Sequence, residues 1–146
     1  MKSTLRLILV VALLLAAAPA VAGKGGPTVE GFWGGAGHAI YPDGTIVEIV
    51  EVEASLLQDG YFFFGEAFFT VILGDSEQVT QDAHMSGHIK GNALTGLMGF
   101  CWDEAPDCVG AGVFEGKLSG NRLSGTVVDL NDGSTSFITL HRTSID

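Results

Sequence analysis

The sequence has few of the residues and none of the motifs on which catalysis and nucleic-acid binding usually depend. Its 146 residues include seven Lys and Arg against 17 Asp and Glu, which gives a net charge of −10 at pH 7. A chain this acidic repels phosphate backbones, so nucleic-acid binding is disfavoured. The sequence contains no phosphate-binding loop and no HExxH or CxxC metal motif, and no catalytic triad can be assigned. We therefore expect a protein that is not an enzyme and needs no cofactor or metal.

Long apolar runs are absent outside the first 22 residues. There, the basic stretch "MKSTLR" precedes "LILVVALLLAAA", which is too short for an ordinary transmembrane helix, and Ala20 and Ala22 then provide small residues for cleavage. This pattern is typical of a secretory signal peptide. We expect a secreted or periplasmic protein with a signal peptide at 1–22, a flexible lead at 23–28 and a single domain at 29–146. No membrane span is expected in the mature chain.

Cysteine is scarce, and the two cysteines are close together at Cys101 and Cys108. Two thiols without neighbouring histidine ligands do not make a zinc site. In an exported chain the default state of such a pair is a disulfide. The loop between them, "CWDEAPDC", carries three carboxylates, but their spacing matches no calcium loop, and we interpret the loop as a solvated hairpin tip. Trp102 in this loop would pack on the barrel mouth or contact a partner.

Helical periodicity with caps is also absent, and what remains is short apolar–polar alternation between turn residues. "YPDGT", "LQDGY", "KGNAL", "SGNRL" and "LNDGS" contain pairs that supply the positive φ angles of tight hairpins. The alternation predicts eight strands, at 29–41, 45–57, 60–73, 77–90, 93–101, 108–119, 121–131 and 134–143. Consecutive hairpins of this kind favour an all-β fold, an eight-stranded antiparallel up-and-down β-barrel. A β-sandwich is the alternative.

A near-repeat supports this hairpin interpretation. "GHIKGNALTG" begins at Gly87, and "GKLSGNRLSG" follows from Gly116 at an offset of 29 residues. Each copy predicts a strand, a Gly-Asn turn and a second strand. The residues expected on the inner face are Ile89 and Leu94 in the first copy and Leu118 and Leu123 in the second. Several glycines expected on the inner face would leave room in the lumen: Gly65, Gly87, Gly96, Gly116 and Gly125.

Two strands carry further information about the faces of the sheet. In 45–57 the acidic positions Glu48, Glu51 and Glu53 change parity, so keeping all three outside predicts a β-bulge near Ile49–Val50. In 60–73 the expected inward residues are Tyr61, Phe63, Ala67, Phe69, Val71 and Leu73. Phe62, Phe64, Phe68 and Ile72 then fall on the outer face. An apolar stripe on the outer face has two interpretations. It marks a surface that contacts a partner or a second copy of the chain, or it belongs to a sheet that is covered on both faces.

The first and last predicted strands carry a resemblance. Gly31-Phe32-Trp33 near the start of the first strand and Arg142 at the end of the last resemble the structural motif of the calycin superfamily, which includes lipocalins and a class of bacterial periplasmic protease inhibitors. The resemblance implies that Arg142 lies across the Trp33 ring and closes one barrel end. The chain departs from lipocalins in its short first turn, "YPDG". It also departs from avidins, because "GGAGH" replaces the biotin-binding residues.

The resemblance and the apolar lumen together suggest a non-enzymatic binding protein that carries a small apolar ligand. The expected ligand-binding residues are the large inward side chains Trp33, Phe63, Phe69, Met85, Met98 and Phe114. The alternative is a protein-binding module such as a periplasmic protease inhibitor. Its cues are the flexible lead, the Trp102 loop and the outer stripe of Phe62, Phe64 and Phe68.

Overall fold

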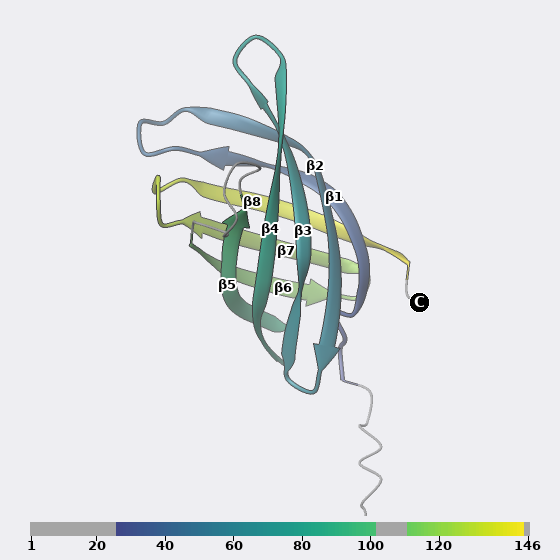
Figure 1. Cartoon of the computed structure of the whole chain (residues 1–146). Coiled ribbons are helices and arrows are strands. Elements are labelled where there is room, and N and C mark those ends of the chain that lie inside the picture. The colour runs from purple at the N-terminus through teal and green to yellow at the C-terminus, as the bar shows by residue number, and fades with distance from the viewer. Residues whose placement is uncertain (1–25, 102–110, 145–146) are drawn as a thin grey trace, which may run out of the picture.

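All the regular structure that the computed structural model describes, in residues 26–101 and 111–144, is β-strand. The strands are β1 (Gly31–Ile40), β2 (Ile46–Asp59), β3 (Phe62–Leu73), β4 (Glu77–Lys90), β5 (Ala93–Cys101), β6 (Gly112–Ser119), β7 (Arg122–Asp129) and β8 (Thr135–Ser144). They wrap around one common axis, and β8 returns to lie beside β1 (Figure 1). The predicted signal peptide lies outside the described residues.

The strands form a closed barrel in which each pairs antiparallel with its sequence neighbour, and β1 pairs with β8. Closure removes the exposed strand edges that an open sheet would present. The predicted eight-stranded up-and-down barrel is confirmed, and the sandwich alternative is excluded. The predicted strand limits agree with the structure to within three residues wherever the chain is described.

The repeated Gly-Asn segments form the β4–β5 and β6–β7 hairpins, as predicted. Gly91 and Gly120 have φ angles of 60° and 59°, the left-handed conformation that glycine adopts without steric cost. Ile89 pairs with Leu94 in the first hairpin, and Leu118 pairs with Leu123 in the second. All four side chains are buried, so each hairpin contributes a matched apolar pair to the core.

The predicted bulge is present in β2. The register between β2 and β3 shifts between Ile49 and Glu51, and the same segment shifts against β1. One extra residue therefore restores the parity that places Glu48, Glu51 and Glu53 on the outside.

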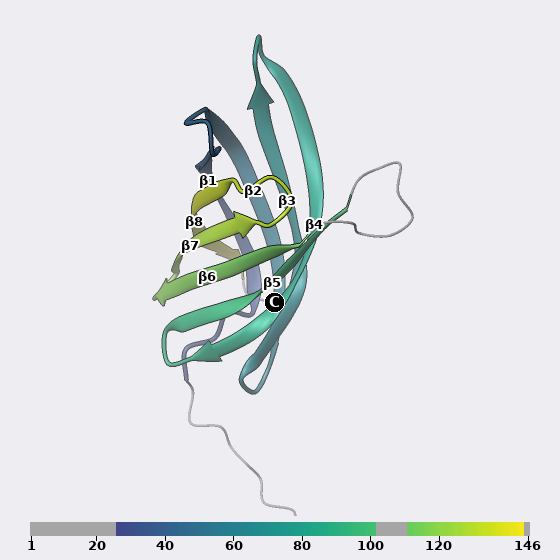
Figure 2. The same ribbon diagram turned by 90° about the vertical axis from the view of Figure 1, so that its left-hand side faces the viewer.

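The β3–β4 hairpin projects beyond the rest of the barrel (Figure 1, Figure 2). Two residues predicted to face inward are exposed because they lie at the two ends of β3. Tyr61 is 76% exposed because it lies in the turn before β3, and Leu73 is 39% exposed because it borders the projecting turn. Phe63, Ala67 and Phe69 are buried as predicted. The inward assignment of Tyr61 and Leu73 was wrong because alternation alone does not show where a strand leaves the core.

Candidate functional site

The side chains predicted to bind a ligand all lie inside the barrel. Trp33, Phe63, Phe69, Met85, Met98 and Phe114 are each buried and belong to one continuous apolar core. The Phe63 and Phe114 rings meet edge to face, with centroids 6.4 Å apart and an interplanar angle of 80°. This is a preferred arrangement of aromatic pairs in protein cores.

The inner glycines do not leave room in the lumen, contrary to the prediction. A Cβ atom at Gly116 or Gly125 would lie 2.7 or 2.5 Å from ring atoms of Phe114, which occupies the space that these two glycines provide. At Gly65, Gly87 and Gly96 a Cβ atom would lie 2.0, 2.2 and 2.4 Å from a carbonyl oxygen of the neighbouring strand.

Among the described residues, the core side chains enclose a central void of about 10 Å³. Its lining includes Phe69, Met85, Met98 and Phe114. A void of this size is at the limit for a single water molecule. Small-molecule sites usually have volumes of about 300 Å³ or more. A lipid-sized molecule would therefore have to displace core side chains to enter.

One end of the barrel is closed by Trp33 and Arg142, as the resemblance implied. Trp33 faces inward and is 1% exposed, and its indole Nε1 donates a hydrogen bond of 2.8 Å to the carbonyl oxygen of Val29. The Arg142 Cζ atom lies 4.5 Å from the centroid of the Trp33 ring. Its guanidinium nitrogens donate to the carbonyl oxygens of Thr28 and Glu30. The chain that precedes β1 is thus held across the barrel end.

Two features of sequence and charge support this closure. Gly31 has a φ angle of 124°, which side-chain-bearing residues rarely adopt, so glycine fits the turn into β1. Burial lowers the pKa of Arg142 from its ordinary value, yet a guanidinium group stays charged at neutral pH. The charge is therefore available for the contact with the Trp33 ring.

We predict a favourable coupling between Trp33 and Arg142 of about 1–2 kcal/mol, the range for a partly desolvated cation–π contact. Chemical denaturation of wild type, Trp33→Leu, Arg142→Leu and the double variant measures this coupling. Arg142→Lys should lose part of it, since an ammonium group cannot stack flat on a ring. Strictly additive losses in the two single variants would contradict the pairing.

The outer face of β2 and β3 carries large apolar side chains. Phe62, Phe64 and Phe68 of β3 are 58%, 48% and 42% exposed, and Leu57 of β2 pairs with Phe64. We call these four residues the outer apolar face. The described residues place no other segment over it. The ring contact that Phe62 makes is with His88 of β4, at 4.6 Å between centroids.

A groove runs beside this face, over β1, β2 and β3. It has a volume of about 330 Å³, and its lining includes Phe32, Gly34, Glu53, Ser55, Phe68 and Thr143. The sequence does not show this groove, because its lining residues come from β1, β2, β3 and β8 and meet only through the register of the sheet. Phe68 was the one of them singled out as part of a contact surface.

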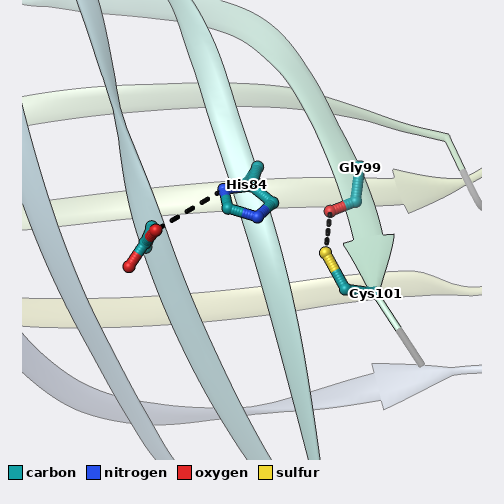
Figure 3. A network of polar contacts seen from close by, with 4 residues as sticks. His84, Gly99 and Cys101 are labelled. Atoms are coloured by element: carbon teal, nitrogen blue, oxygen red, sulfur yellow. Dashed lines mark hydrogen bonds and ion pairs between the residues drawn. The ribbon is translucent and has the colours of Figure 1, made fainter. Parts of the chain in front are cut away.

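Two polar contacts lie on the outer face of β3, β4 and β5. Nδ1 of His84 lies 3.8 Å from Oε1 of Glu66, and Sγ of Cys101 lies 4.0 Å from the carbonyl oxygen of Gly99 (Figure 3). Across residues 26–101 and 111–144, no group of three or more His, Cys, Asp and Glu side chains is placed to hold a metal ion. Cys108 and Trp102 lie outside the described residues, so the Cys101–Cys108 disulfide stays a prediction.

No protein-family model matches the chain, and no curated protein sequence matches it significantly. Among the described residues there is no helix long and apolar enough to cross a membrane.

Proposed function

We propose that this protein is an exported, non-enzymatic, calycin-like barrel that binds a protein partner through its outer apolar face. The observation that carries this proposal is the contrast between the two sides of the sheet. The interior is filled by its own side chains, whereas three phenylalanines and a leucine remain exposed on neighbouring strands. Exposed apolar patches of this kind mark interaction sites more often than they are neutral surface.

Two further observations support the proposal. The Trp33–Arg142 contact has the geometry that the calycin resemblance implied. The superfamily that the chain resembles includes a class of bacterial periplasmic protease inhibitors, whose partners are proteins. The first 22 residues have the pattern of a secretory signal peptide, which would place the barrel where extracellular or periplasmic partners are found.

The predicted lumen ligand is the second candidate, and one observation favours it. Met85 and Met98 both line the central void, and methionine side chains repack more readily than branched or aromatic ones. A ligand that enters the lumen would have to move these two side chains, so the two functions predict different effects on Met85 and Met98. Partner binding on the outer apolar face leaves both methionines in place.

Affinity capture from the native extracellular or periplasmic fraction tests the proposal. Wild-type protein should retain a stoichiometric partner. Phe64→Ser should weaken binding of this partner about tenfold or more, because the variant lacks the exposed half of the phenylalanine side chain that the partner would bury. Phe137→Ser on β8 is the matched control, because Phe137 is 42% exposed and lies outside the outer apolar face. Equal retention by both variants would contradict the proposal.

A further inference from the structure

The groove over β1, β2 and β3 combines two aromatic walls with a carboxylate. Phe32 of β1 and Phe68 of β3 stand diagonally on either side of β2, because Phe32 pairs with Ser55 whereas Phe68 pairs with Glu53. Two strand spacings and an offset of two residues place their Cα atoms about 12 Å apart. Between them β2 presents Glu53 and Ser55, and Gly34 of β1 adds no side chain. The hollow therefore exists because short or absent side chains lie between two large rings.

The register brings two more carboxylates to the border of the groove. Glu66 pairs with Ser55, and Asp82 of β4 pairs with Phe68, and both side chains are exposed. No lysine or arginine occurs in β1, β2 or β3. The basic side chains near the groove are His141, which pairs with Gly34, and His84, which lies near Glu66. Arg142 is also near, but it lies against the Trp33 ring and donates to the carbonyl oxygens of Thr28 and Glu30. At neutral pH this side of the barrel is thus both aromatic and negatively charged.

The geometry points to a binding site for an arginine side chain of a protein partner, whose guanidinium group would occupy the groove. Aromatic faces attract cations, and arginine does so more often than lysine. A planar guanidinium can stack on a ring while its N–H groups donate to a carboxylate such as that of Glu53. The groove volume of about 330 Å³ lies at the lower end of ordinary ligand sites, which suits one long side chain.

This inference rests on the proposed function, because it names the chemistry of the partner that the outer apolar face would bind. Phe68 belongs to both the groove and the outer apolar face, so the two surfaces are continuous. A partner segment with an arginine beside apolar residues would fill the groove and cover Phe64 at the same time. The negative charge of the mature chain would also speed the approach of such a segment.

A titration followed by amide NMR tests the site with a defined probe. The probe is a short acetylated peptide with one arginine between two leucines, and the comparison peptide carries citrulline, which keeps the shape but lacks the charge. The arginine peptide should shift the amide signals of Gly34, Glu53 and Phe68 with a dissociation constant in the range of about 1–10 mM. The citrulline peptide should bind about fivefold more weakly, mainly because it loses the charge-assisted hydrogen bonds to Glu53.

Two variants localise the effect. Glu53→Gln should remove most of the difference between the peptides, whereas Glu115→Gln on β6 should leave it unchanged, because Glu115 lies outside the groove. Equal affinity for both peptides, no shifts up to about 20 mM, or shifts centred on β6–β8 would overturn the inference. So would concentration-dependent self-association that Glu53→Gln abolishes, since Lys117 or Arg122 of a second copy would then be the occupant.

The two proposals fail separately. If partner capture depends on Phe64 but not on Glu53, the cation site is wrong and the outer apolar face remains the binding surface. If neither residue affects capture, the proposed function is wrong as well.

Discussion

Replacing Trp33 with alanine should lower the free energy of unfolding by about 3–5 kcal/mol, the largest effect of any single truncation proposed for this barrel. The side chain is fully buried at the closed end, where it donates to the Val29 carbonyl and lies under Arg142. Its removal leaves a cavity, an unpaired carbonyl and a guanidinium group without its aromatic partner. Denaturant unfolding followed by circular dichroism measures the loss.

The control for this prediction is Trp33→Phe, which keeps an aromatic ring and should cost less than the alanine variant. If Trp33→Ala costs under about 1 kcal/mol, as an exposed substitution would, the closed barrel end is not as described.

Gly35→Ala should destabilise the barrel by about 3 kcal/mol, at the upper end of the usual cost of overpacking. A Cβ atom at Gly35 would lie 2.0 Å from the carbonyl oxygen of Thr139 and 2.9 Å from Cα of Leu140. Both are backbone atoms of β8, so relief requires the β1–β8 pairing that closes the barrel to open.

The preceding residue is a matched control for this substitution. A Cβ atom at Gly34 would lie 3.4 Å from the nearest atom, the Cγ2 methyl of Thr143, which is an ordinary contact with a side chain. Gly34→Ala should therefore change the free energy of unfolding by no more than about 0.5 kcal/mol. Thermal unfolding of the two variants side by side measures the difference. Equal stability of the two variants would contradict the β1–β8 register.

The fold could be predicted because its determinants are local or depend on simple parity. Turn pairs such as Gly91-Asn92 specify hairpins, and alternation specifies which residues face the core. The bulge followed from three glutamates that had to share one face. The Trp33–Arg142 contact was implied by the resemblance to calycins, and closure of the barrel makes the strands that carry the two residues neighbours.

Other features could not be predicted because they depend on distances between strands. The sequence shows that Gly116 and Gly125 lack side chains, but not that the Phe114 ring fills the space beside them. The groove depends on the placement of Phe32 and Phe68 on either side of β2, which only the register specifies. Arg142 donates a hydrogen bond to the carbonyl oxygen of Thr28, which lies in the segment 23–28 that composition alone marks as flexible.

We propose that this barrel binds its partner through the outer apolar face because side chains fill the core that the structure describes. Two of the three methionines of the sequence, Met85 and Met98, line the central void. Their methyl groups, labelled with carbon-13, report on the lumen directly. Fatty acids and retinoids should leave both methyl signals unchanged, and the captured partner should instead shift the amide signals of Phe64 and Phe68. A saturable shift of the Met85 and Met98 methyls with an apolar ligand would contradict this account and restore the lumen as the binding site.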